Sequence, residues 1–423
     1  MSDKEIISMR SVDQGMQSID ESVKKLLSGG GKDIPLFKVF IPESVIEPLR
    51  EVLLSGYIGE GPRVEEFEQQ LALWFNNDNV LALNNGTATL QLALRLANVG
   101  YGDEVVSTAM TCTATNEPIL AMGAKIVWAD IDPWTGNINP DDVAKKVTPK
   151  TKAIMCVHWG GYPCDLDELN AIAAEHGIKL IEDACHAFSS IYHGKPIGSH
   201  SDFACFSFQA IKEMTTVDGG ALVCKSKADR ERGRLLRWYG IDRKSKRKDL
   251  RCEEDIVEYG YKFHMNDVTA VIGLEQLKYV GKTIEKHRAN AARYNEAFKN
   301  LKTVRPLRYK DDRSSVCWLY TVRVKNRQKF MEHMKKAGVT VSQVHARNDL
   351  HTMFEDFRAD LPGVDEFTSE QVSIPVGWWL TEKDLAHIIN AVLEYERYLR
   401  PRIQEMKKPP RKYEKKMAHR PNL

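Results

Sequence analysis

The sequence has no apolar stretch long enough to cross a membrane, and its charges nearly cancel. A spanning helix needs about 18 consecutive apolar residues, and no run in the 423 residues approaches that length. The formal net charge is only +2, with 60 Lys and Arg against 58 Asp and Glu. Nucleic-acid-binding domains carry a clear basic excess. We therefore expect a cytoplasmic protein that binds neither membranes nor nucleic acid.

The spacing of the cysteines also argues against a metal site and against a disulfide framework. The eight cysteines never occur as C-x-x-C, and several stand inside apolar runs such as "FACFSF" and "ALVCK". Closely spaced ligand pairs are typical of structural zinc sites, and dense disulfides are typical of small secreted domains. We expect buried free thiols and no metal site.

Short apolar runs alternate with amphipathic segments from about residue 79 onward. Runs such as "KIVWADI", "AIMCVHW" and "KLIED" have the length of buried strands, whereas "DLDELNAIAAEHG" has helical periodicity. This alternation is typical of an α/β domain whose mostly parallel sheet is flanked by helices on both faces. We expect four parts: an N-terminal extension and linker (1–34), a large domain (35–295), a smaller C-terminal α+β domain (296–400) and a basic tail (401–423).

Ligands of open parallel sheets gather at the carboxyl ends of the strands, and the segment "NNGTAT" stands at one such end. It follows an apolar strand and opens an apolar-periodic helix, so the amides of Gly86, Thr87 and Ala88 would point out of a helix N-terminus. Such amides bind anions, and glycine permits close backbone approach. An Asn-Gly pair before a helix is also a common turn and cap, so both interpretations stay open on this motif alone.

The segment "KLIEDACHA" ends a buried strand with two adjacent carboxylates, Glu182 and Asp183. Successive side chains of a strand face opposite sides, so the two cannot point at one ligand. By itself the pattern fits a catalytic Asp183 or one that caps the next segment.

Lys212 stands five residues after Ser207, in the turn that follows the strand "FACFSF". A partly desolvated lysine can form an imine with a carbonyl compound. An isolated loop lysine is more commonly a surface residue, so the order of the motifs has to decide.

In order along the chain, G-T-A, E-D-A-x-H, S-F-x-x-x-K and D-G-G-A resemble the DegT/StrS family of sugar aminotransferases. These are fold-type-I pyridoxal phosphate enzymes, with the fold of aspartate aminotransferase. The resemblance covers roughly residues 36 to 400 and includes "SGYIGEGPRVEEFE", "HWGGYPCDLDEL" and "SIPVGWWLT". It implies an aminotransferase whose cofactor is pyridoxal 5′-phosphate.

The resemblance also implies a role for each motif. Lys212 would bind the cofactor covalently and then move the proton as acid and base. Asp183 would pair with the pyridinium nitrogen, and His186 would donate to the phenolic oxygen. The 5′-phosphate would be held by Ser207, Gly86, Thr87 and Ala88.

Relatives complete this site with a residue of the neighbouring subunit, in the segment that reads "GYKFHM" here. The contact to the phosphate would come from Lys262 or from His264, and the resemblance implies a homodimer with shared active sites.

Two positions mark this chain within the family pattern. Cys112 stands where relatives usually stack an aromatic ring on the cofactor, and a cysteine lacks that stacking area. Lys212 is retained, whereas the sugar-deoxygenating branch has histidine there, so amino transfer is favoured over dehydration.

The implied reaction moves an amino group from glutamate or glutamine to a 3-keto or 4-keto sugar, including deoxy sugars, carried on a nucleoside diphosphate. The product would be an amino sugar for a surface polysaccharide or a glycosylated metabolite. In the basic run "GIDRKSKRKDLR", Arg243, Lys246 and Arg247 either contact the diphosphate or form a solvated loop. Two alternatives stay open: a keto-cyclitol aminotransferase, and a pyridoxal-phosphate-binding regulator without turnover.

Overall fold

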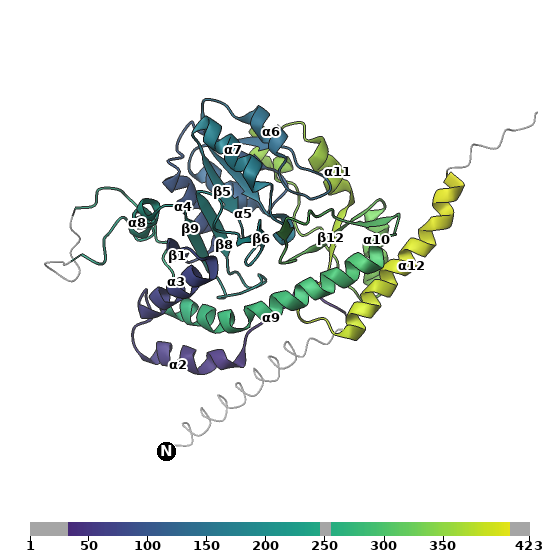
Figure 1. Cartoon of the computed structure of the whole chain (residues 1–423), viewed down its shortest axis with the longest axis horizontal. Coiled ribbons are helices and arrows are strands. Elements are labelled where there is room, and N and C mark those ends of the chain that lie inside the picture. The colour runs from purple at the N-terminus through teal and green to yellow at the C-terminus, as the bar shows by residue number, and fades with distance from the viewer. Residues whose placement is uncertain (1–32, 246–254, 407–423) are drawn as a thin grey trace, which may run out of the picture.

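The computed structural model describes residues 33–245 and 255–406, with side chains as far as residue 399. Its centre is a seven-stranded sheet in the order β1-β9-β8-β5-β4-β2-β3 (Figure 1). Strand β9 is antiparallel to both neighbours, and the remaining strand pairs are parallel. The strands are β1 (Val80–Leu83), β2 (Glu104–Thr108), β3 (Lys125–Ala129), β4 (Thr151–Val157), β5 (Lys179–Asp183), β8 (Phe203–Ser207) and β9 (Gly220–Cys224).

The strands of this sheet are buried because helices pack on both of its faces. Every residue of β1, β8 and β9 is buried, as expected for strands covered on both faces. The covering helices are α3 (Pro62–Phe75), α4 (Gly86–Leu96), α5 (Thr113–Ala121), α6 (Pro140–Lys146), α7 (Leu166–His176) and α8 (Lys227–Leu236), whereas α2 (Ile46–Leu54) packs on α9 (Asp267–Phe298). The expected α/β fold class, with a mostly parallel sheet flanked by helices, is confirmed.

A smaller α+β unit follows the long helix α9 (Asp267–Phe298), which runs from α3 toward this unit (Figure 1). Its antiparallel sheet has the order β10-β12-β13. The C-terminal half of α9 contributes Ala291, Tyr294 and Phe298 to its core. Its elements are β10 (Val304–Pro306), β12 (Tyr320–Val324), α10 (Arg327–Lys336), α11 (Pro362–Glu370), β13 (Gln371–Ile374) and α12 (Glu382–Met406).

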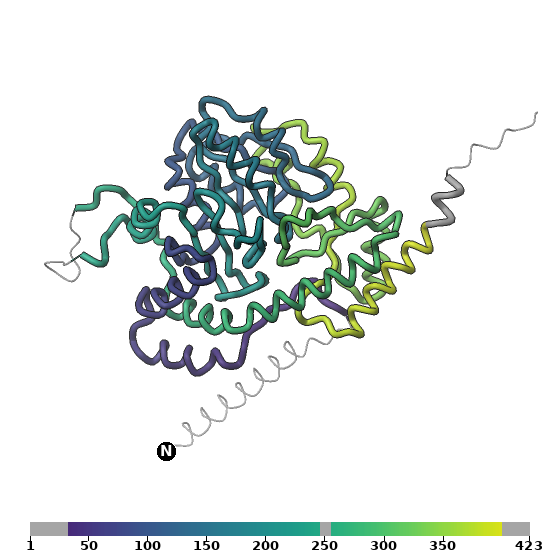
Figure 2. The backbone as a smooth tube through the Cα atoms, in the orientation of Figure 1, coloured from purple at the N-terminus to yellow at the C-terminus, as the bar shows by residue number. Residues whose placement is uncertain are grey.

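Shorter elements join the two units. A second small sheet pairs β11 (Arg313–Ser314) with β6 (Ile191–Tyr192), and β6 with β7 (Lys195–Pro196). Before α2 the chain passes the C-terminal unit, where Ile34 pairs with Val339 (Figure 2). The 3₁₀ turns are η1 (Glu43–Val45), η2 (Trp159–Gly161), η3 (Asn348–Leu350) and η4 (Thr352–Phe357).

The boundary between the two units is less simple than a cut at residue 295. Trp318 and Leu319 belong to the core of the large sheet although they precede β12 directly, and Phe354 and Phe367 also pack on that core. The proposed division into 35–295 and 296–400 stays a prediction.

The described residues contain no helix that is long and apolar enough to cross a membrane. In the same ranges the seven cysteines are free thiols, and no group of three or more potential metal ligands is found. Cys252 lies outside the described residues.

Candidate active site

A cavity of about 410 Å³ lies where the carboxyl ends of β5 and β8 meet the N-termini of α4 and α5. Most of the residues singled out in the sequence line it together: Gly86, Thr87, Cys112, Asp183, His186, Ser207 and Lys212. These residues come from four separate chain segments, and the parallel sheet gathers them at one edge.

Asp183 ends β5 and is 4% exposed. One carboxylate oxygen accepts a 2.6 Å hydrogen bond from the Thr115 hydroxyl, and the other accepts a bond from the Cys185 amide at 3.1 Å. Thr115 is in turn bonded to the Thr111 hydroxyl at 2.8 Å. These contacts fix the carboxylate toward the cavity, whereas Glu182 faces the other side and bonds His158 Nε2 at 2.9 Å. The strand alternation expected from the sequence is therefore confirmed.

Ser207 and Lys212 border the cavity from the end of β8 and the turn after it. The turn is closed by the Lys212 amide, which donates to the Gln209 carbonyl at 3.0 Å. Ser207 Oγ accepts from the Gln209 amide at 3.3 Å, so its hydroxyl proton is available to a ligand. The Lys212 Nζ lies 3.8 Å from the ring centroid of Trp318.

His186 is buried in the same cavity, and its Nδ1 has no hydrogen-bond partner within the described residues. Its ring stacks on Trp318 with centroids 4.0 Å apart and lies parallel to His345 at 5.5 Å. Burial, followed by the charge of Lys212, lowers the pKa of His186 well below its ordinary value. The same two causes lower the pKa of His345 to about 4. Both imidazoles are neutral at pH 7 and can each donate one hydrogen bond.

The N-terminus of α4 presents two of the three amides that were expected to bind an anion, those of Gly86 and Thr87. Asn85 caps the helix, because its side chain accepts from the Ala88 amide at 2.7 Å. Ala88 does not line the cavity, so the structure does not bring this residue to the site. The amides of Gly86 and Thr87 have no acceptor within the helix, as in any first turn.

Cys112 lies at the N-cap of α5 and lines the cavity, half-buried. The aromatic rings that line the cavity are instead Phe37 and Trp318. The sequence reasoning missed these two residues, together with His345 and Thr115. Trp318 stands in the apolar run "VCWLYTVRV", and nothing in the local spacing connects it with Lys212.

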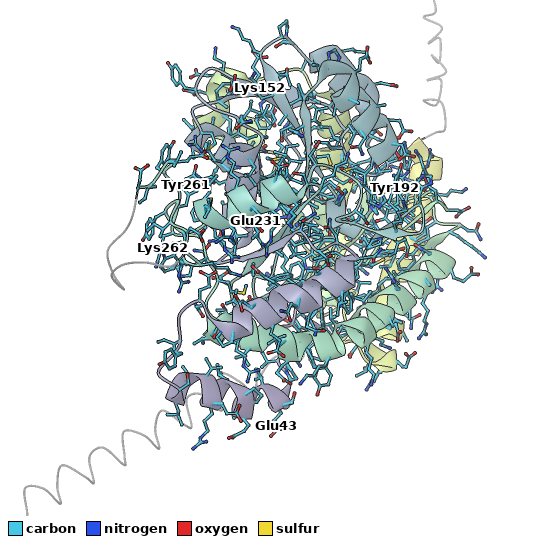
Figure 3. The ribbon with its side chains drawn as sticks, turned by 60° about the vertical axis from the view of Figure 1, so that its left-hand side comes forward. Glu43, Lys152, Tyr192, Glu231, Tyr261 and Lys262 are labelled. Atoms are coloured by element: carbon cyan, nitrogen blue, oxygen red, sulfur yellow. The ribbon has the colours of Figure 1, made fainter. Side chains whose placement is uncertain are left out.

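The two candidates for a contact across a dimer lie away from the cavity of their own chain. Lys262 is exposed, with its Nζ 3.6 Å from the centroid of the Trp238 ring, and His264 packs on the same ring at 3.8 Å. Tyr261 and Lys262 lie at the edge of the molecule (Figure 3). Burial, and then the charge of Lys262, lowers the pKa of His264 to about 4.

The basic run is only partly described. Arg243 donates to Glu60 at 2.6 Å and lies over the Trp238 ring at 4.6 Å, so its charge is already paired. Lys246 and Arg247 lie outside the described residues.

Comparison with known proteins identifies the family. The model of the DegT/DnrJ/EryC1/StrS aminotransferase family matches residues 40–393. The chain belongs to this family. It is 31% identical to the spore coat polysaccharide biosynthesis protein SpsC of Bacillus subtilis (strain 168), over 85% of this chain and 96% of the relative. An uncharacterized protein of Methanocaldococcus jannaschii is 33% identical over the same shares of the two chains.

Solved structures agree with this assignment. The sugar aminotransferase CalS13 of Micromonospora echinospora is 39% identical and superposes with a TM-score of 0.83, covering 85% of this chain and 99% of its own. AtS13 of Actinomadura melliaura is 42% identical with the same TM-score, over 86% and 99% of the two chains. This family member is an aminotransferase with the fold-type-I architecture, as the resemblance implied.

Membership of the family implies pyridoxal phosphate as cofactor, and the cavity residues fit that group. The free first-turn amides and the Ser207 hydroxyl suit a phosphate. The fixed Asp183 carboxylate suits a protonated ring nitrogen, and the unpartnered Nδ1 of His186 suits a phenolic oxygen. Lys212 supplies the amine that an aldehyde requires.

A substitution at Gly86 tests how tightly the N-terminus of α4 packs against the end of β8. A Cβ at this position would come within 2.7 Å of Ser207 Cβ and 3.1 Å of Cys185 Sγ. We expect Gly86→Ala to lower the free energy of unfolding by about 1–3 kcal/mol, the usual cost of overpacking, and to weaken pyridoxal phosphate binding. Thermal unfolding and a binding titration measure the two effects.

The matched control is Gly100→Ala, where the nearest atom to a new Cβ is Asp103 Oδ2 at 3.9 Å. We expect no loss of cofactor affinity in this control. Unchanged stability and affinity in Gly86→Ala would contradict the close packing of α4 against β8.

Proposed function

We propose that the protein transfers an amino group from glutamate or glutamine to the 3-keto or 4-keto carbon of a nucleoside-diphosphate-linked sugar, including deoxy sugars, with pyridoxal phosphate as cofactor. The observation that carries the proposal is the convergence of Lys212, Asp183 and His186 in one cavity. The names of two relatives support a sugar as substrate. One solved structure is a sugar aminotransferase, and one sequence relative is a spore coat polysaccharide biosynthesis protein.

When bound, pyridoxal phosphate supplies an aldehyde that takes up amines and a ring that accepts the electrons of a breaking C–H bond. Lys212 is the residue whose amine would hold the cofactor at its aldehyde carbon. With the amino donor bound, the same amine would take and return the proton. Asp183 would keep the ring nitrogen protonated through a charge-assisted hydrogen bond. It can do so because Thr115 and the Cys185 amide hold its carboxylate in place.

The remaining residues bind and orient. Ser207 and the amides of Gly86 and Thr87 hold the phosphate at the helix N-terminus. His186 is neutral and donates from one ring nitrogen to the phenolic oxygen. Trp318, Ser342 and His345 line the cavity from the part of the chain that follows α9.

We propose further that the active unit is a homodimer with shared sites. Lys262 and His264 lie outside the cavity of their own chain, which is the placement expected of residues that act on a neighbour. Large apolar side chains are exposed near them and at the end of α2, including Val257 at 94% and Tyr57 at 81%. Where exposed apolar side chains gather into one patch, they mark protein–protein interfaces.

The ion pairs of the basic run limit which of its residues can contact the diphosphate of the substrate. Arg243 is already paired with Glu60, so a contact to the diphosphate falls to Lys246 and Arg247. Such charge-assisted contacts contribute about 1.5–3 kcal/mol each when held in place.

The first prediction of this proposal concerns Lys212. Protein incubated with pyridoxal phosphate should become yellow, and borohydride should fix the cofactor to Lys212, because among the described residues it is the lysine that lines the cavity. Peptide mapping by mass spectrometry locates the label. Label on another lysine would contradict the assignment, and a labelled protein that never exchanges its amino group with glutamate or glutamine would favour the regulator.

The second prediction concerns sharing of the site. A Lys212→Ala chain mixed with a Lys262→Ala/His264→Ala chain should regain activity, because one of the two sites in the mixed dimer carries neither change. Differentially tagged chains allow the mixed dimer to be purified and its activity measured. An inactive mixed dimer of verified mass would show that each chain forms its own complete site.

The third prediction concerns the diphosphate. Lys246→Glu/Arg247→Glu should raise KM for the nucleotide sugar at least tenfold, as expected when contacts of about 1.5 kcal/mol or more are lost. The glutamate half-reaction should be unchanged, because glutamate carries no phosphate. Steady-state kinetics with separated half-reactions make the comparison.

Lys150→Glu/Lys152→Glu is the matched control, because both lysines are exposed and neither lines the cavity. An equal effect on the two half-reactions would indicate that the basic run has a structural role and does not contact the diphosphate. Activity with a keto-cyclitol and none with nucleotide sugars would replace the proposed substrate class.

A further inference from the structure

The amine of Lys212 has an aromatic neighbour but no carboxylate partner. Within the described residues Lys212 makes no ion pair, and its Nζ lies 3.8 Å from the centroid of the Trp318 ring. Within the described residues no ion pair joins Lys212 to the adjacent Glu213, and burial raises the pKa of that carboxyl to about 8. Both carboxyl oxygens of Glu213 also lack a hydrogen-bond partner in this part of the chain. A tryptophan face is the strongest aromatic partner of an ammonium group.

Trp318 is itself held in one orientation. Its indole N–H donates to the Ile211 carbonyl at 2.8 Å. The ring stacks on Phe37 at 5.3 Å and on His186 at 4.0 Å, each at an interplanar angle of 23°. The residue is 4% exposed. A rotation of the indole would break the hydrogen bond and both stacked contacts, so the ring is a rigid support.

The hydrogen bond and the ring act on the same short turn. The indole N–H holds the backbone of Ile211, and the ring face holds the amine of the next residue, Lys212. Trp318 lies two residues before β12, whereas Lys212 follows β8. The position of the lysine therefore depends on a residue from a distant part of the chain that packs on the core of the large sheet.

Packing alone does not account for this arrangement. A buried indole N–H needs an acceptor, and here that acceptor is the carbonyl of Ile211, in the turn that carries Lys212. The ring face meets the amine of Lys212 itself, the residue to which the proposed function assigns the covalent bond and the proton transfer.

We propose that Trp318 is a positioning residue for Lys212, which fixes the turn through Ile211 and holds the free amine over its ring face in the cavity. This inference rests on the proposed function of Lys212. Positioning raises the local concentration of a reacting group and so accelerates each step in which the amine takes part.

The test compares Trp318→Leu with Trp318→Phe. Leucine removes the ring face and the N–H, whereas phenylalanine keeps a weaker ring face and removes only the N–H. Trp134→Leu is the matched control, because the Trp134 ring also supports a cation, Arg308 at 3.7 Å, and does not line the cavity. Circular dichroism and thermal unfolding establish that each variant is folded.

The main readout is the rate at which cofactor-free protein attaches pyridoxal phosphate to Lys212. It is followed by absorbance and by borohydride trapping with peptide mapping. We expect attachment to be about tenfold slower in Trp318→Leu, because an amine that is no longer held in place reaches the aldehyde less often in the reactive geometry. Trp318→Phe should be intermediate, and Trp134→Leu should match the wild type. The rate of the glutamate half-reaction should fall in the same order, with KM for glutamate unchanged.

Wild-type attachment rates in Trp318→Leu would overturn the inference, as would equal losses in the two variants. If Trp318→Leu does not fold, Trp318→Phe decides alone, and a wild-type rate in that variant overturns the proposal. Attachment of the cofactor to another lysine in the wild type would instead refute the proposed function, so the two failures are distinguishable.

Discussion

The site depends on the parallel pairing of β5 with β8. In this register Asp183 lies beside Cys205, and side chains opposite each other share a face of the sheet. Ser207, two residues beyond Cys205, shares that face, so the carboxylate and the hydroxyl both border the cavity. A slip of one residue would turn Glu182 toward the cavity and Asp183 into the packing around His158.

The pairing of β5 with β8 also requires glycine at two neighbouring backbone positions. Helix α4 begins against the end of β8, so close that a Cβ on Gly86 would come within 2.7 Å of Ser207. Gly220, which opposes Ser207 in β9, is equally restricted, because a Cβ there would meet the carbonyls of Asn85 and Phe206 at 2.7 Å. Glycine at both positions brings the helix N-terminus close to the strand ends, and this closeness leaves an anion-binding site at the edge of the sheet.

Burial sets the chemistry of the groups gathered there. The Asp183 carboxylate is acceptable inside the protein because Thr115 and the Cys185 amide satisfy it. His186 and His345 lie near Lys212 and are held neutral. The lysine therefore works among neutral imidazoles and aromatic rings, with the Trp318 face as its nearest support. An amine in such surroundings is held in place without an ion pair that a reaction would first have to break.

The sequence by itself determined the features that rest on local periodicity. Alternating apolar runs and amphipathic segments indicated the flanked sheet, strand alternation separated Asp183 from Glu182, and motif order brought Ser207 and Lys212 into one site. The tertiary structure decided the rest. It placed Trp318 and His345 beside Lys212, engaged the Ala88 amide with Asn85, and paired Arg243 with Glu60. Spacing along a strand or helix fixes which way a side chain points. Contacts between residues more than a hundred positions apart, such as Lys212 and Trp318, arise only when separate elements pack together.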